Sequence, residues 1–115
     1  KFYGKSLIYY FAFNTDNISK DLKPDVDFEE LVEHIKENKA IKVVITGHTD
    51  EIGKEESNYQ LGLKRAKNVA GIFQQKGVDL ARITTESKGE NAPIASNESD
   101  AGRAKNRRIE IILQQ

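Results

Sequence analysis

The chain has 115 residues, 37% of them hydrophobic and 31% charged, and its 18 basic and 18 acidic side chains leave no net charge. This balance argues against a domain that binds nucleic acid through its phosphates, because such domains carry an excess of Lys and Arg. The absence of cysteine excludes disulfides, zinc–thiolate sites and cysteine nucleophiles.

The length fits a single domain, residues 1–115, that is large enough to bury a hydrophobic core of its own. No apolar run reaches the roughly 20 residues that are needed to span a bilayer. Because the chain contains no methionine, not even at its start, we expect it to be a fragment of a longer protein whose targeting or anchoring segment lies outside it.

The first half of the chain predicts a strand, a helix and a second strand. Ser6–Phe13 (SLIYYFAF) is nearly all apolar, which is typical of a strand that is covered on both faces and central in its sheet. Asn14 follows it, at the end of the strand where ligands of open α/β sheets bind. An amphipathic helix is predicted over Pro24–Asn38, because apolar residues recur at i, i+3, i+4 and i+7. It leads into a strand at Ile41–Thr46, and this order favours a right-handed crossover and a parallel pair.

A second helix is predicted over Asn58–Gln75. Ser57 and Gln60 match a capping box at its start. Gly77 matches the left-handed residue that commonly follows a helix.

The last third of the chain predicts two strands around a long connection. Ile83–Ser87 is a short, polar strand, and Arg107–Leu113 is the last strand. Gly89–Asn106 is predicted to be a loop, and loops of this length in compact domains are usually functional or mobile. The sequence therefore predicts an α/β fold, an α+β sandwich, with a mixed four-stranded sheet in the order β-α-β-α-β-β and the helices packed on one face.

The stretch between the second strand and the second helix carries charges that could form a site. Asp50 follows the strand end, and Asn58 and Arg65 fall at the edge of the apolar arc of the helix. An arginine there needs a partner, because an unpaired buried charge is costly. One hypothesis is a structural salt bridge from Asp50 to Arg65. The other is a ligand with an amine and a carboxylate at one end, since aspartate accepts from an ammonium and arginine binds a carboxylate through paired hydrogen bonds.

Other candidate groups carry weaker signals. His48 could be a catalytic base or a metal ligand, but the only other histidine is His34, and no established metal-ligand spacing is present. A hydrogen bond from His48 to loop backbone is the simpler interpretation. No serine lies in a nucleophile elbow, and no glycines form a phosphate-binding fingerprint. We therefore expect no enzymatic activity, no metal and no cofactor.

A basic run precedes the last strand, and it includes Arg107 and Arg108. Alternation along a strand sends these two side chains to opposite faces. One of them is therefore expected to line the same pocket as Arg65, and the sequence does not decide which.

Three motifs occur in order along the chain: GHTD-x-x-G at Gly47–Gly53, N-x-x-L-G-x-x-R-A at Asn58–Ala66, and GRAKNRR-I-E at Gly102–Glu110. Together they closely resemble the OmpA-like C-terminal domain. That family includes the periplasmic domains of outer-membrane protein A, the peptidoglycan-associated lipoprotein and the flagellar stator protein MotB. The opening FAFNTDNI also resembles the first strand and turn of the family, so the resemblance extends from about Leu7 to Leu113.

The resemblance implies non-covalent binding of peptidoglycan through the meso-diaminopimelate of the stem peptide, whose side-chain end carries an amine and a carboxylate on one carbon. Carried over by motif, Asp50 binds the amine and Arg65 the carboxylate. Further ligand contacts are implied for Asn58, Thr49, Asn14, Arg107 and Arg108.

The resemblance also implies a periplasmic domain that anchors the outer membrane or an envelope complex to the cell wall, attached to the outer membrane through a part of the chain outside this sequence. Whether the parent is a porin-like barrel, a lipoprotein or a flagellar stator stays open, and we expect the isolated domain to be a monomer. Two alternatives are a hydrolase that acts on the wall and a protein-interaction module of the same fold with a vestigial pocket, in which Gly89–Asn106 docks a partner.

Overall fold

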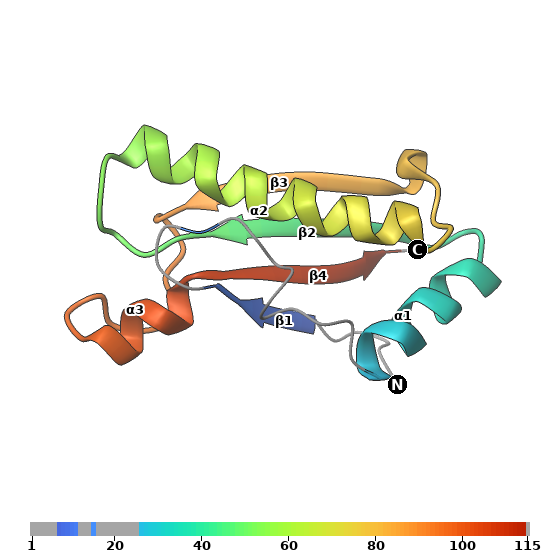
Figure 1. Cartoon of the computed structure of the whole chain (residues 1–115), viewed down its shortest axis with the longest axis horizontal. Helices are drawn as coiled ribbons and strands as arrows, with labels where there is room; N and C mark the ends of the chain where they lie inside the picture. Colours follow the sequence, from blue (N-terminus) through green and yellow to red (C-terminus); the bar gives the residue numbers. More distant parts are fainter. Residues whose placement is uncertain (1–6, 12–14, 16–25, 115) are drawn as a thin grey trace.

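The computed structural model describes residues 7–11, 15 and 26–114 (Figure 1). Its four strands form one mixed sheet in the order β1-β4-β2-β3, in which β2 and β3 are parallel and β4 is antiparallel to both of its neighbours. The predicted mixed four-stranded sheet is confirmed. In chain order the elements are β1 (Leu7–Tyr10), α1 (Val26–Glu37), β2 (Lys42–His48), α2 (Glu55–Gln75), the 3-10 turn η1 (Leu80–Arg82), β3 (Ile83–Gly89), α3 (Asp100–Asn106) and β4 (Arg108–Gln114).

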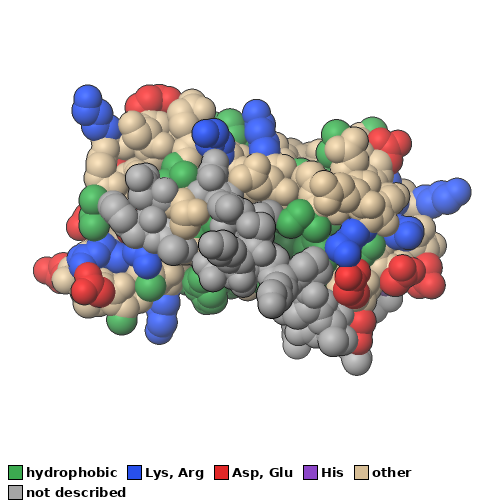
Figure 2. Space-filling model, in the orientation of Figure 1, with side chains coloured by type: hydrophobic (Ala, Val, Ile, Leu, Met, Phe, Trp, Pro, Cys, Tyr) green, Lys and Arg blue, Asp and Glu red, His purple; other side chains and the backbone are tan. Residues whose placement is uncertain are grey.

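Helices α1 and α2 pack on the same face of the sheet, as predicted (Figure 1). The ring of Phe28 on α1 lies 4.8 Å from that of Phe73 on α2 and 6.1 Å from that of Tyr9 on β1. Alternate residues of the two central strands complete this core, and all are at most 1% exposed: Val43, Ile45, Ile109 and Ile111. Charged side chains of both signs are interspersed around the face shown in Figure 2.

Strand β1 lies at the edge of the sheet, so the prediction of a central first strand was wrong. Strand β4 separates it from β2, and the two strands predicted to pair run in the same direction without being neighbours. The outward side chain of Tyr10 is 50% exposed. An apolar run indicates that a strand can be buried, but it does not show which strand lies beside it. Here β4 pairs with both β1 and β2.

Helix α2 begins earlier than predicted. It starts at Glu55 after Lys54, whose side chain makes no capping hydrogen bond, so the predicted capping box at Ser57 was wrong. The amide Nε2 of Gln60 instead donates to Glu56 Oε2 one turn earlier, at 3.0 Å. The predicted end is confirmed, and Gly77 follows it with a φ of 101°.

The predicted loop 89–106 contains a third helix, α3, so the order of elements is β-α-β-α-β-α-β. Ser99 caps this helix, because its Oγ accepts from the backbone N–H of Gly102 at 3.0 Å. The cap followed by Asp100 is an ordinary helix-start signal, but the helix is too short for its apolar periodicity to be recognised.

The backbones of α2 and β2 touch where the helix crosses the end of the strand. A Cβ built on Gly47 would lie 1.7 Å from the carbonyl oxygen of Gly62, and one built on Gly62 would lie 2.4 Å from Ser87 Oγ. Asn58 and Arg65 lie four residues before and three residues after Gly62, on the same helix face. The glycine contact therefore sets how closely these two side chains approach the end of β2.

On the opposite face of the sheet, segment 90–107 covers a charged cluster. Alternation places Arg108 and Glu110 on the face away from the core, and His48 is the partner of Arg108 in the ladder. The guanidinium of Arg108 donates to Glu110 Oε2 at 2.7 Å and to the backbone oxygens of Asn106 and Ala92 at 3.2 and 3.0 Å. Arg108 thus fastens this segment onto the sheet.

The side chain of His48 is 3% exposed, and neither of its ring nitrogens has a hydrogen-bond partner within the described part of the chain. The expected hydrogen bond from His48 to loop backbone was wrong, and the neighbouring Arg108 is the side chain that donates to backbone oxygens there. Burial, and then the neighbouring charge of Arg108, lower the pKa of His48 from its usual 6.5 to about 4, although Glu110 opposes the shift from 3.9 Å. His48 is therefore a neutral buried side chain at neutral pH.

We predict that Gly47→Ala destabilises the domain by about 3 kcal/mol, because the added methyl group overlaps helix backbone that cannot move alone. Urea denaturation of both proteins measures the change in the free energy of unfolding. Gly71→Ala is the matched control: nothing lies within 4 Å of a Cβ at Gly71, so alanine should stabilise α2 by about 0.5 to 1 kcal/mol. Equal stability of Gly47→Ala and wild type would contradict the backbone contact.

We predict that His48 makes the domain less stable as pH falls from 6.5 toward 4. Over this range the unfolded chain binds a proton at His48 while the folded chain, with its lowered pKa, does not. The linked loss of unfolding free energy is about 3 kcal/mol at pH 4. Urea denaturation at several pH values should show this loss in wild type and a correspondingly smaller one in His48→Gln. Identical pH dependence in both proteins would contradict it.

Candidate functional site

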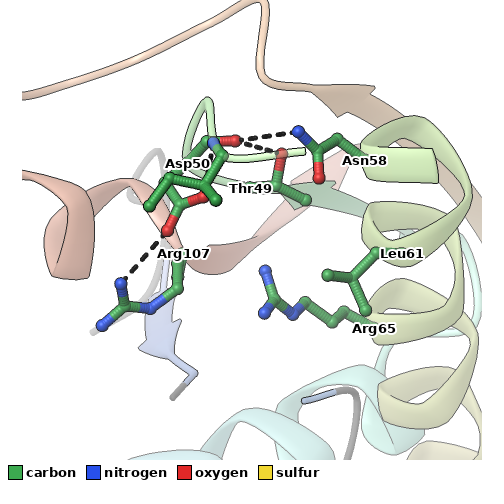
Figure 3. Close-up of a pocket in the computed structure, with 7 residues that line it drawn as sticks. Thr49, Asp50, Asn58, Leu61, Arg65 and Arg107 are labelled. Atoms are coloured by element: carbon green, nitrogen blue, oxygen red, sulfur yellow. Dashed lines mark hydrogen bonds and ion pairs between the residues drawn. The ribbon is translucent and has the colours of Figure 1, made fainter. Parts of the chain in front are cut away.

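A pocket lies at the carboxyl end of β2, between the loop that follows this strand and the first half of α2 (Figure 3). It contains five of the residues predicted from the sequence, together with Ile52 and Leu61. The lining residues are Thr49, Asp50, Ile52, Asn58, Leu61, Arg65 and Arg107. Asn14 lies outside the described residues, and Arg108 belongs to the cluster on the other face.

Asp50 provides the negative charge of the pocket, and the residue is almost completely buried, at 3% exposed. Its Oδ1 accepts from the backbone N–H of Ile52 at 3.0 Å, which holds the loop in a tight turn. Its Oδ2 lies 3.2 Å from Arg107 Nη1 and forms an ion pair. Of the two hypotheses for Asp50, the structural salt bridge exists, but its partner is Arg107 and not Arg65.

Arg65 is fully buried, at 0% exposed, and is held by backbone oxygens from two other segments. Its Nη1 donates to His48 O and its Nε to Thr15 O, each at 2.9 Å. Its Cζ lies 4.9 Å from the centre of the Phe11 ring, a distance at which the ring face attracts a cation. These contacts offset the loss of water around the charge, and Figure 3 shows the guanidinium pointing from α2 into the pocket.

Arg107 reaches the pocket from the junction between α3 and β4. Its Nε donates to Phe11 O at 2.9 Å, and its side chain remains 17% exposed. Arg107 is therefore the more accessible of the two guanidiniums, while Arg65 forms the floor.

The polar wall of the pocket is organised around the backbone oxygen of Asp50. Thr49 Oγ1 donates to this oxygen at 2.8 Å, and Asn58 Nδ2 lies 3.3 Å from it (Figure 3). Asn58 Nδ2 also donates to Glu90 Oε1 at 2.9 Å. Glu90 was not predicted from the sequence, although a signal exists: it follows β3, and the ends of parallel strands meet at one edge of a sheet.

The size and charge of the pocket restrict what it can bind. The free space is about 30 Å³, which is room for one or two water molecules. It therefore accepts the charged tip of a ligand, and a larger group requires a side chain at the rim to move. With one buried carboxylate and two guanidiniums in its walls, the pocket suits a group that carries both charges.

Within residues 7–11, 15 and 26–114, no group of three or more His, Cys, Asp or Glu side chains is placed to hold a metal ion. None of the helices described there is long and apolar enough to cross a membrane.

Comparison with known proteins shows which family the chain resembles. The sequence profile of the OmpA family matches residues 10–107. The peptidoglycan-associated lipoprotein of Legionella pneumophila is 35% identical over 107 residues, which are 93% of this chain and 60% of that protein. Outer membrane protein A of Bordetella avium is 48% identical over 69 residues, which are 60% of this chain and 36% of that protein. The chain thus spans less than two thirds of the length of these relatives.

Solved structures agree with the sequence matches. The crystal structure of the peptidoglycan-associated lipoprotein from Burkholderia pseudomallei gives a TM-score of 0.80 at 29% identity and covers 93% of this chain and 89% of that one. The C-terminal domain of Helicobacter pylori MotB gives 0.74 at 28% identity, over 94% and 84%. The cell wall anchor of the T6SS from Pseudomonas aeruginosa gives 0.67 at 28% identity, over 92% and 78%. By sequence profile and by fold, the chain belongs to the OmpA family.

Proposed function

We propose that this domain binds peptidoglycan without covalent chemistry, through the meso-diaminopimelate of the stem peptide, and anchors the outer membrane or an envelope complex to the cell wall from the periplasm. The names of its relatives support the wall as the partner: two are peptidoglycan-associated lipoproteins, and one is a cell wall anchor. The family relationship also supports a binding domain and not an enzyme.

The observation that carries the proposal is a buried carboxylate and a buried guanidinium in one small pocket. Asp50 is 3% and Arg65 0% exposed, and both line the same cavity. The free end of meso-diaminopimelate carries an ammonium and a carboxylate on one carbon. In this arrangement the ammonium donates to Asp50 and the carboxylate accepts from Arg65, and both bonds are charge-assisted.

Arg107 is the side chain that the ligand ammonium would displace from Asp50. Its Nη1 forms an ion pair with Asp50 Oδ2 at 3.2 Å, so an incoming ammonium has to share that oxygen or replace Arg107 there. Arg107 remains partly exposed, and it can turn toward the ligand carboxylate when it leaves Asp50. Every buried charge then keeps a partner throughout, which avoids the large cost of an isolated charge.

The pairing of Asp50 with the ammonium and Arg65 with the carboxylate predicts selectivity for diaminopimelate over lysine. A stem peptide with lysine at this position keeps the ammonium and lacks the carboxylate. Arg65 would then lie against a ligand that cannot accept its hydrogen bonds, and a site built for a polar group rejects an analogue that lacks it.

We predict that Asp50→Asn weakens binding of the tetrapeptide L-Ala-γ-D-Glu-meso-diaminopimelate-D-Ala by about ten- to a hundredfold, because a hydrogen bond to a charged group is worth about 1.5 to 3 kcal/mol. Calorimetric titration and co-sedimentation with purified sacculi measure the loss. Glu51→Gln is the matched control: this exposed neighbour does not line the pocket. Unchanged wall binding by Asp50→Asn would oppose the clamp and favour the interaction-module alternative.

We predict that the wild-type domain binds the diaminopimelate tetrapeptide at least about tenfold more tightly than its lysine counterpart. Peptides are required, because free lysine has an amino acid end of its own. In Arg65→Lys the preference should shrink, since lysine has no paired donors to match a carboxylate. Unfolding curves of both proteins separate this effect from a loss of stability. Equal affinity of the wild-type domain for the two peptides would contradict the assignment of Arg65.

A further inference from the structure

The orientation of the Asn58 carboxamide is fixed by its surroundings. Its nitrogen lies 3.3 Å from the backbone oxygen of Asp50 and 2.9 Å from Glu90 Oε1. A carbonyl oxygen and a carboxylate oxygen both accept hydrogen bonds, so the group that faces them has to be the NH₂ group of the amide. The side chain is 5% exposed, which leaves its nitrogen little water as an alternative partner.

With its nitrogen directed at these two acceptors, the Asn58 amide presents its oxygen to the other side. Figure 3 shows this oxygen on the side of the carboxamide toward Leu61 and Arg65, which line the pocket together with Asn58. Its Oδ1 lies 3.6 Å from the position of a Cβ built on Gly53, beside the loop that carries Asp50. The pocket therefore contains a neutral acceptor in addition to the Asp50 carboxylate.

Glu90 is the group that makes this orientation strongly preferred. Without Glu90, only the longer bond to the Asp50 oxygen would distinguish nitrogen from oxygen in the amide. Glu90 follows the end of β3, where the backbone of Gly89 packs closely against α2. A Cβ on Gly89 would lie only 3.2 Å from the backbone of Tyr59, the helix residue after Asn58. The N–H of Thr49 also donates to Gly89 O at 2.9 Å, which ties this strand end to the Asp50 loop.

We propose that Glu90 is a positioning residue that acts through Asn58: it holds the carboxamide with its oxygen toward the pocket, where that oxygen accepts a second hydrogen bond from the ligand ammonium. This inference rests on the proposed function. An ammonium has three N–H donors, and Asp50 and Asn58 supply acceptors for two of them. A reversed amide would turn its own donors toward the ammonium and its oxygen toward the Glu90 carboxylate.

The test is Glu90→Gln, which keeps the size of the side chain and removes the charge. The glutamine amide can donate to Asn58 and so permits the reversed orientation. We expect binding of the diaminopimelate tetrapeptide to weaken about fivefold. Binding of the analogue with 2-aminopimelate in place of diaminopimelate, which keeps the carboxylate and lacks the ammonium, should not change.

A double-mutant cycle with Asn58→Ala separates positioning from a general effect of charge. If Glu90 acts through Asn58, Glu90→Gln has no further effect in the Asn58→Ala background. Glu86→Gln is the matched control, because it removes the same charge from β3, the strand that Glu90 directly follows, and it should bind as wild type does. Loss of affinity for both peptides, persistence of the effect without Asn58, or no effect at all would overturn the proposal.

The free protein gives an independent readout. In NMR spectra without ligand, the side-chain amide signals of Asn58 should move, and their exchange with water should speed up, on Glu90→Gln. Unmoved signals would overturn the positioning role even if the wild-type domain binds diaminopimelate. If the wild-type domain fails to bind the tetrapeptide while these signals move, the proposed function and the ammonium contact are overturned and the amide orientation stands.

Discussion

The contact on which the site depends is the meeting of two backbones at Gly47 and Gly62. Any side chain at Gly47 would hold α2 away from β2, since a Cβ there falls 1.7 Å from a helix carbonyl. The helix can therefore place Asn58 and Arg65 directly over the end of the strand. Arg65 then donates to the oxygen of His48, the last residue of that strand, at 2.9 Å. The spacing of the polar groups follows from this approach of main chains.

A second property of the site is that each of its charged side chains has a partner before any ligand arrives. The Asp50 carboxylate already has Arg107, and the guanidinium of Arg65 has carbonyl oxygens and the Phe11 ring. Such a site is stable when empty, because no buried charge is left alone. A ligand has to compete with these existing contacts, the Asp50–Arg107 ion pair among them. A group with only one charge can replace the partner of the carboxylate or that of a guanidinium, but not both.

Much of the fold could be predicted from sequence because it follows from local patterns. The apolar stripe of α1, the β-branched run of β2 and the glycine after α2 each specify an element, and the structure contains all of them. The order of strands could not be predicted in the same way. That β4 separates β1 from β2 depends on which ladders form between distant segments, and composition does not encode it.

The candidate site shows the same division. Asp50, Asn58 and Arg65 were predicted to lie together because they flank one loop, and the structure places them in one pocket. The partner of Asp50 was not predictable, because Arg107 is 57 residues away in the chain. Glu90 was missed for the same reason, since it is 32 residues from Asn58 and reaches it only through the pairing of β3 with β2. Sequence reasoning found the local half of the pocket.

The long spans between these contacts have a consequence for how the domain matures. Arg107 binds the oxygen of Phe11 across 96 residues, and Arg65 binds that of Thr15 across 50. Strand β4, which is synthesised last, lies between two strands that are made first and second. A chain that ends before β4 lacks the strand that joins β1 to β2, and it lacks the Arg107 wall of the pocket. Loop closure over such distances also slows folding. The pocket is therefore complete only after β4 has paired with both of its neighbours.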